Sequence, residues 1–160
     1  MIIFSETQRF KQVWIWIALT ISTAFLCYNA YIEYLNNKII SIQVVFGFSV
    51  MLILFILFYV SRLKTIIDEE KIQYKFHPLH LKYKTILSFE IEKIEIIKYR
   101  PLDYGGWGIR RGLGIKVYSI SGNKGIKITT KNEKLLIGTL LSESTRLNQL
   151  IDILYQKTKK

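Results

Sequence analysis

The segment Tyr104–Gly112 carries the most unusual chemistry of the chain, because four glycines lie among two arginines and a tryptophan. Glycine allows positive φ and close approach of the backbone, so the segment predicts a tight, irregular loop. Arg110 and Arg111 could donate forked hydrogen bonds to a phosphate or carboxylate, and Trp107 could pack on the ligand or enter a headgroup layer. The alternative is a bulged hairpin in which the arginines bond to a carboxylate such as Asp103.

The candidate site extends from this loop to basic residues on the adjoining strands. Their clustering predicts a basic face that binds an anionic lipid headgroup or an acidic partner. Each Lys or Arg near an anionic surface contributes about 1 kcal/mol. The predicted ligand-binding residues are Lys98, Arg100, Trp107, Arg110, Arg111 and Lys116.

The sequence predicts neither catalysis nor metal binding. His77 and His80 are close in the sequence, but a metal site needs three or four converging ligands, and surface histidines at a turn are the simpler interpretation. Ser119 and Ser121 have no neighbouring base that would activate a nucleophile. We therefore predict no catalytic residues, no metal and no cofactor. An enzyme acting on lipid substrates remains the weakest of the alternatives.

Two apolar stretches without Asp, Glu, Lys, Arg or His fill most of the first part of the chain, at residues 12–32 and 39–61. At about 1.5 Å per residue, either stretch would cross the roughly 30 Å hydrocarbon core of a bilayer as a helix. Only residues 33–38 separate them, which permits an antiparallel hairpin. We predict a cytoplasmic leader over residues 1–11 and a two-helix transmembrane hairpin over residues 12–61.

The charges on either side of the hairpin predict its orientation. Arg9 and Lys11 precede the first stretch and Arg62 and Lys64 follow the second, whereas the connecting loop offers only Lys38. The positive-inside rule therefore places both termini in the cytoplasm of a multi-pass cell membrane protein.

The formal net charge of +11 predicts a partner for the second part of the chain. All but three of the 23 Lys and Arg residues, and all but two of the 12 Asp and Glu residues, follow residue 61. A domain this basic, tethered near an anionic leaflet, is expected to bind membrane lipids. Lys greatly outnumbers Arg and the chain is rich in Ile and Asn, so composition explains part of the charge. No nucleic-acid partner is predicted.

Residues 62–160 predict one β domain followed by a helix. Alternating or β-branched runs bounded by turn residues predict seven strands, at 64–68, 71–77, 80–87, 93–100, 114–120, 125–130 and 134–139. After Gly138 the pattern changes to helical spacing, with Leu147, Leu150 and Leu154 on one face. This change predicts an amphipathic helix over residues 142–156.

Seven antiparallel strands followed by one amphipathic helix is the order of a pleckstrin-homology-like (PH-like) barrel. Through Tyr99-Arg100-Pro101, Tyr104–Arg110 and Tyr118–Gly125, the chain resembles bacterial membrane proteins with two N-terminal transmembrane helices and a PH-like domain, a group mostly of uncharacterised function. The resemblance implies a membrane α-helical hairpin plus an all-β PH-like barrel, capped by a C-terminal α-helix. It implies no reaction.

The sequence favours a membrane-anchored interaction module that binds a protein partner or an anionic lipid headgroup at the inner leaflet. The alternative is a structural or assembly subunit of a larger membrane complex that acts through its transmembrane helices. Polar residues of the first span, such as Thr20 and Asn29, could hydrogen-bond to a partner helix. Such residues facing a partner would favour the alternative.

Overall fold

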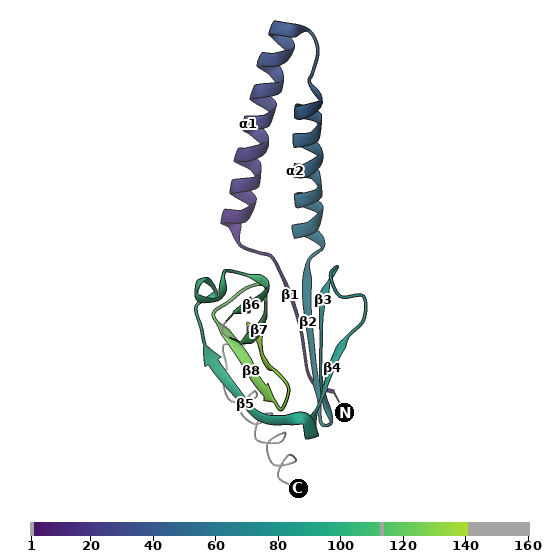
Figure 1. Cartoon of the computed structure of the whole chain (residues 1–160), viewed down its shortest axis with the longest axis vertical. Helices are drawn as coiled ribbons and strands as arrows, with labels where there is room; N and C mark the ends of the chain where they lie inside the picture. The colour runs from purple at the N-terminus through teal and green to yellow at the C-terminus, as the bar shows by residue number, and fades with distance from the viewer. Residues whose placement is uncertain (1, 113, 141–160) are drawn as a thin grey trace. The chain divides into compact units, whose positions relative to one another are not determined.

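The computed structural model describes residues 2–112 and 114–140 of the chain (Figure 1). The chain divides into two compact units. A helical unit spans Lys11–Val60, and a β unit combines Met1–Phe10 with the chain from Ser61 onward. The helix predicted over residues 142–156 lies outside the described residues.

The helical unit contains α1 (Val13–Asn37) and α2 (Ile42–Val60). Both helices are long and apolar enough to cross a membrane, by length and composition. The two predicted helices are thus present, and the first continues beyond its apolar stretch to Asn37. Lys38 ends it in the left-handed conformation, with φ of 58°, and its N–H donates to the Tyr34 carbonyl at 2.9 Å.

Two polar side chains of the first apolar stretch, Thr20 and Asn29, bond to the backbone of α1 itself. The Thr20 hydroxyl donates to the Trp16 carbonyl at 2.8 Å, and the Asn29 amide donates to the Phe25 carbonyl at 2.7 Å. These bonds to the preceding turn satisfy groups that would be costly to leave unpaired in hydrocarbon. From the sequence, both residues were candidates for hydrogen bonds to a partner helix. In the structure, each bonds within its own helix.

The β unit consists of two sheets, with strand orders β1-β2-β3-β4 and β5-β8-β9-β7-β6. All seven predicted strands are present, two with the predicted bounds and five with shifted ends, and two further strands were not predicted. The strands are β1 Ile2–Arg9, β2 Arg62–Asp68, β3 Lys71–His77, β4 Lys84–Leu87, β5 Ile91–Lys98, β6 Gly108–Gly112, β7 Ile115–Ser119, β8 Lys124–Thr130 and β9 Lys134–Thr139. The short 3-10 helices η1 (Ser88–Glu90) and η2 (Pro101–Tyr104) flank β5.

The sheets differ from the predicted barrel in two respects. Within residues 2–112 and 114–140 they are two separate sheets rather than a closed barrel. The prediction that all strands are antiparallel is also wrong for one pair, because β7 and β9 are parallel. The reason is the strand order: β9 returns from β8 through a tight turn and enters the sheet between β8 and β7, so it runs in the direction of β7.

The main core lies between the two sheets. In β2 and β3 alternate residues are buried, as expected when one face of each strand meets the core. The buried residues of this core are Leu63, Ile67, Ile72, Tyr74, Phe76, Ile86, Ile91, Ile94, Tyr118, Ile120, Ile126, Ile128, Leu135 and Ile137. Both sheets contribute to it, so it holds the β unit together.

A second apolar cluster lies on the other face of the second sheet. Val117 and Leu136 have no exposed surface and pack with Tyr99. They alternate along their strands with Tyr118, Leu135 and Ile137 of the main core. The second sheet is therefore buried on both faces around β7 and β9.

The segment predicted as a leader forms β1, the edge strand of the first sheet, and belongs to the β unit. It pairs antiparallel with β2, from Ile2 opposite Asp68 to Arg9 opposite Arg62. Gln8 is 1% exposed, and its side-chain amide donates to the Gly138 carbonyl of β9 at 2.7 Å. β1 therefore joins the two sheets, which a separate leader would not do.

Candidate functional site

One end of the first sheet is joined directly to the two apolar helices. β1 ends at Arg9 and leads into α1 through residues 10–12, while Ser61 alone separates α2 from β2. Arg9 pairs with Arg62, and Arg62 pairs with His77 at the end of β3. We call this the helix-linked end of the β unit and define it by Arg9, Arg62 and His77. Three strands of the first sheet thus meet where the chain enters and leaves its candidate spans.

The second sheet contributes the ends of three strands to the same region. The Glu6 carboxylate accepts hydrogen bonds from the Thr139 hydroxyl at 2.6 Å and from the Leu140 N–H at 2.8 Å. Lys124 pairs with both Thr139 and Lys98 across the sheet. Lys98, Lys124 and Thr139 are therefore neighbours across β5, β8 and β9. They lie at the end of the second sheet that is next to the last residues of β1.

A surface hollow of about 580 Å³ opens at this end of the second sheet. It is lined by Lys98, Tyr99, Arg100, Pro101, Asp103 and Asn123. Lys98 and Arg100 are exposed, whereas Tyr99 between them is buried. This alternation directs both cations away from the core, so they can reach a ligand in the hollow. Burial raises the pKa of the Tyr99 phenol, which stays protonated near neutral pH.

The glycine-rich loop follows η2, whose residues Pro101 and Asp103 line this hollow. η2 ends at Gly105, which has φ of +83°, and Gly106 donates its N–H to the Pro101 carbonyl at 2.8 Å. The Arg110 Nε–H donates to the Gly105 carbonyl at 2.8 Å. The first part of the segment is an irregular loop, as the glycines predicted, whereas Gly108–Gly112 form β6 and a hairpin with β7. Arg110 of β6 contacts the loop through a backbone carbonyl. This bond, rather than one to Asp103, holds the arginine side chain.

The structure divides the predicted basic face into two groups. Lys98 and Arg100 share the hollow, whereas Trp107 is half-buried in the glycine-rich loop and does not line it. Arg111 and Lys116 line a different hollow, of about 260 Å³. Lys116 pairs with Leu135 in β9, four residues before Thr139, so the two groups are roughly 13 Å apart along the sheet.

Arg110 and Arg111 also separate across the second sheet. They are neighbours in β6, and successive side chains of a strand point to opposite faces. Arg110 pairs with Val117 on the second-cluster face, and Arg111 pairs with Lys116 on the other. The two arginines therefore do not act as one pair toward a single ligand.

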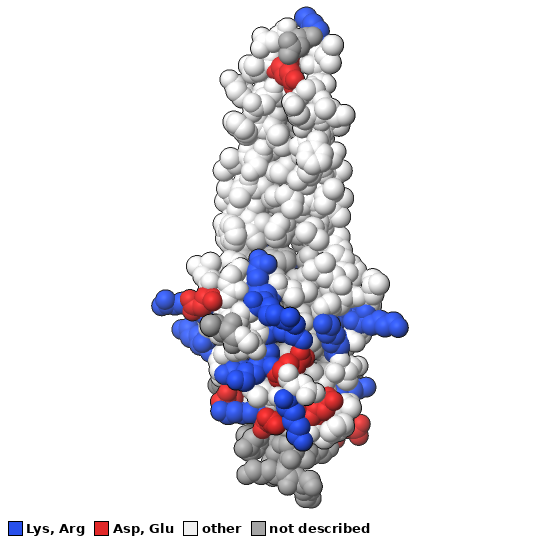
Figure 2. Space-filling view, in the orientation of Figure 1, with Lys and Arg blue, Asp and Glu red and all other residues white. Residues whose placement is uncertain are grey.

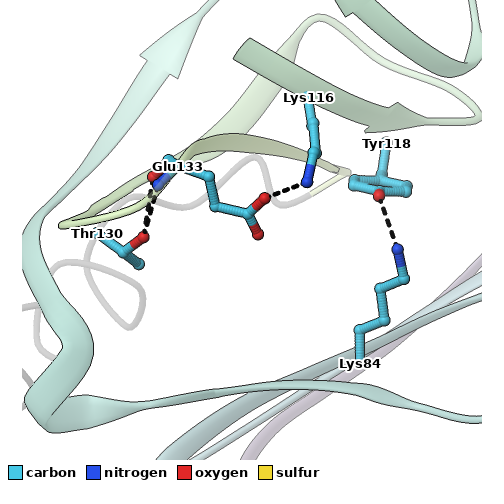
Figure 3. Close-up of polar contacts among 5 residues, drawn as sticks. All are labelled: Lys84, Lys116, Tyr118, Thr130 and Glu133. Atoms are coloured by element: carbon cyan, nitrogen blue, oxygen red, sulfur yellow. Dashed lines mark hydrogen bonds and ion pairs between the residues drawn. The ribbon is translucent and has the colours of Figure 1, made fainter. Parts of the chain in front are cut away.

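Lys116 forms part of a polar cluster that sequence reasoning missed. Figure 3 shows Glu133 reaching Lys116, and Lys84 of β4 reaching the Tyr118 phenol across the two sheets at 3.3 Å. The turn before β9 is fixed by Thr130, whose hydroxyl donates to the Glu133 carbonyl at 3.0 Å and accepts from the Glu133 N–H at 3.1 Å. Because Glu133 neutralises Lys116, this cluster is a weaker site for an anion than the hollow at Lys98 and Arg100.

Three rings pack against one another next to this cluster. The Tyr74 and Tyr118 ring centroids are 4.8 Å apart, and the His80 centroid is 5.5 Å from that of Tyr118. Burial, together with Tyr118, raises the pKa of Tyr74. Burial and the adjacent Lys84 lower the pKa of His80. Tyr74 and His80 are therefore neutral near pH 7, and Tyr74 and Tyr118 belong to the main core.

Acid is expected to loosen the turn at His80. The Phe76 N–H donates to His80 Nδ1 at 3.3 Å, which requires a neutral ring. Because the folded state lowers the pKa of His80, the unfolded chain binds its proton first as the pH falls below about 6.5, and folding of this turn is weakened. Hydrogen exchange of the Phe76 amide, corrected for intrinsic rate, should be faster at pH 5.5 than at pH 7.5.

Two variants test this pH dependence. His80→Phe keeps the ring but cannot titrate, so the corrected exchange rates at the two pH values should become similar. His77→Gln is the matched control, since His77 is exposed at the end of β3, and it should retain the wild-type difference. An unchanged pH response in His80→Phe would contradict the assignment.

The charged side chains are distributed unequally between the two units. Lys and Arg gather on the face of the β unit that Figure 2 shows, whereas the helical unit is almost free of charged side chains away from the turn that joins its helices. Glu33 lies near the end of α1, and Lys38 follows its last residue. Within the described residues, no group of three His, Cys, Asp or Glu is placed to hold a metal ion.

Comparison of the chain with protein-family models, with curated proteins and with solved structures found no significant match. The resemblance to membrane proteins with a PH-like domain therefore stays a prediction. The two apolar helices and the site at the helix-linked end are the observations from which a function can be argued.

Proposed function

We propose that the protein is a membrane-anchored interaction module whose β unit binds an anionic lipid headgroup at the inner leaflet. α1 and α2 would cross the membrane as a hairpin with both termini in the cytoplasm, and the β unit would complete the predicted PH-like domain together with the C-terminal segment. The observation that carries the proposal is the pairing of β1 with β2 on either side of the two candidate spans.

This pairing favours a hairpin topology. β1 precedes α1 and β2 follows α2, so both outer ends of the helix pair must lie on one side of the membrane for Arg9 to pair with Arg62. Two spans meet that requirement. The excess of Lys and Arg after residue 61 favours the cytoplasmic side. The helix-linked end of the β unit is then tethered within a few residues of the headgroups.

The chemistry of the hollow suggests which headgroups fit. Lys98 and Arg100 can hold a phosphate, with charge-assisted hydrogen bonds from the guanidinium. Asp103 and Asn123 line the same space and can accept from a hydroxyl or an ammonium group. A headgroup that combines a phosphate, net negative charge and a donor group, such as phosphatidylglycerol, fits this set.

The alternative function, an assembly subunit that acts through its helices, has less support. Thr20 and Asn29 bond to their own helix backbone, and the Ser49 hydroxyl of α2 does the same with the Val45 carbonyl at 2.9 Å. Polar groups directed at a partner helix were the feature that would have favoured this alternative. A protein partner that carries an acidic segment could still use the hollow, and the test below distinguishes it from a lipid.

Removing the two cations of the hollow should weaken binding of anionic lipid. Lys98→Gln with Arg100→Gln removes about 2 kcal/mol, taking about 1 kcal/mol for each residue, which is a ten- to thirtyfold increase in Kd at low salt. The full chain, solubilised in a neutral detergent, would be titrated with dioctanoyl phosphatidylglycerol and followed by native mass spectrometry. The effect should shrink as ionic strength rises.

The matched control removes the same charge from the opposite end of the second sheet. Lys131→Gln with Lys134→Gln should leave the Kd for phosphatidylglycerol within about twofold, since Lys131 lies in the turn before β9 and Lys134 is the first residue of β9. Dioctanoyl phosphatidylcholine provides the neutral probe and should bind weakly to all variants. Equal binding of both lipids by the wild-type chain would refute headgroup recognition and leave a protein partner as the ligand of the hollow.

A further inference from the structure

The loop between β3 and β4 exposes apolar side chains at the helix-linked end of the β unit. Leu79 is 64% exposed and Leu81 is 87% exposed, although each is within five residues of the buried Phe76. From these side chains and their place in the sheet, we infer that this loop, residues 78–83, inserts its leucines into the leaflet that holds α1 and α2. The inference rests on the proposed membrane anchoring and names a second lipid contact, separate from the hollow.

The loop is held in one shape by its central histidine. The His80 N–H donates to the Phe76 carbonyl at 2.7 Å, and the Phe76 N–H donates back to His80 Nδ1 at 3.3 Å. The His80 ring packs on the Tyr74 and Tyr118 rings. His80 is thus anchored to the sheet while the leucines on either side of it face outward. Both leucines are presented without further ordering, which lowers the entropic cost of insertion.

The register of the sheet places the loop within reach of the membrane. Arg62 follows α2 after a single residue, and its Cα partner is His77, so the two residues are roughly 5 Å apart. β3 ends at His77, so the loop begins at this end of the sheet. Leu79 and Leu81 flank His80, whose N–H bond to the Phe76 carbonyl keeps the loop close to the end of β3, where His77 pairs with Arg62.

The charges around the loop favour an anionic bilayer as its partner. Lys82 lies in the loop between the exposed Leu81 and Tyr83, and Lys75 Nζ lies 5.6 Å from the centroid of the Tyr83 ring. Leucines that enter the acyl chains, with lysines and a tyrosine at headgroup level, are the arrangement expected of an interfacial segment. Because the loop starts beside Arg62, which follows α2 after a single residue, the bilayer is the apolar phase that we infer for it.

Depth-dependent fluorescence quenching tests this inference on the full chain. A Cys27→Ser background carries one new cysteine, Leu81→Cys, labelled with bimane and reconstituted in nanodiscs of phosphatidylcholine and phosphatidylglycerol. Phe89→Cys is the matched control, because Phe89 is an apolar side chain with 78% exposure in η1, at the opposite end of the first sheet. A nitroxide lipid labelled near the top of its acyl chain should quench the label at residue 81 at least threefold more than the label at residue 89. Iodide in the buffer should show the reverse order.

Equal quenching at both positions, or iodide access at residue 81 as free as at residue 89, would overturn the inference. A second label at Leu79→Cys should agree with the result at residue 81, and disagreement in which residue 79 stays in water would overturn it as well.

Combining Leu81→Cys with the Lys98→Gln and Arg100→Gln changes separates the two proposals. Quenching that persists while phosphatidylglycerol selectivity is lost assigns insertion to the loop alone. Selectivity without quenching retains the hollow and rejects the loop.

Discussion

Deleting residues 2–9 is expected to unfold the β unit while α1 and α2 remain helical. The deletion removes the whole of β1 and leaves the edge of β2 unpaired. It also removes the Gln8 amide from the buried Gly138 carbonyl and the Glu6 carboxylate from Thr139 and Leu140. Hydrogen exchange of the full chain in nanodiscs would measure this, with amides of β2 and β9 losing most of their protection.

A single substitution in β1 should reduce the protection of the β unit by a smaller amount than the deletion. Gln8→Ala keeps the backbone pairing of β1 but leaves the Gly138 carbonyl without this donor, at a cost of about 1–3 kcal/mol. Protection of β9 should fall correspondingly, and amides of α1 serve as the internal control because they belong to the other unit. Unchanged protection of β2 and β9 after the deletion would mean that β1 is an appendage rather than part of the fold.

Gly125→Val should have the second largest effect on stability. A Cβ at Gly125 would lie 2.7 Å from Leu136 Cδ1, 3.1 Å from the Ile137 carbonyl oxygen and 3.1 Å from Tyr99 Cε1. Two of these neighbours belong to the second apolar cluster and one is backbone, so the site can relax little. We expect a loss of about 3 kcal/mol, at the upper end of the usual cost of overpacking.

Gly112→Val is the matched control, because it makes the same change in another strand of the same sheet. A Cβ at Gly112 meets no atom within 4 Å, and its φ is not positive, so the free energy of opening should change little. Hydrogen exchange of the β8 and β9 amides measures both variants. Similar losses at the two positions would contradict the tight packing of the second cluster.

The apolar helices and seven of the strands could be predicted because their signals are local. A run without charged residues and an alternating run bounded by turn residues need no information from distant parts of the chain. β1 was missed because its inward positions include Glu6 and Gln8, which an alternating apolar pattern excludes. Their partners, Gly138–Leu140, lie some 130 residues later, so only the folded sheets make these polar residues suitable for a strand.

The candidate site was predicted in part for a similar reason. Lys98 and Arg100 lie together because they flank one buried tyrosine at the end of a strand that was predicted. Arg110 and Arg111 were taken as one pair because the glycines around them predicted a loop, whereas in β6 they face opposite sides of the sheet. The packing of His80 against Tyr74 and Tyr118 depends on both sheets, so no local sequence pattern predicts it.

The position of β1 before α1 has a consequence for biosynthesis. This strand is translated before both candidate spans, and its partner β2 only after them. Closing such a long loop in an unanchored chain has an entropic cost, and a helix pair inserted as a hairpin would already hold the two ends together. Insertion would thereby become a step of folding, in which the bilayer brings Arg9 to Arg62 before the sheets can assemble.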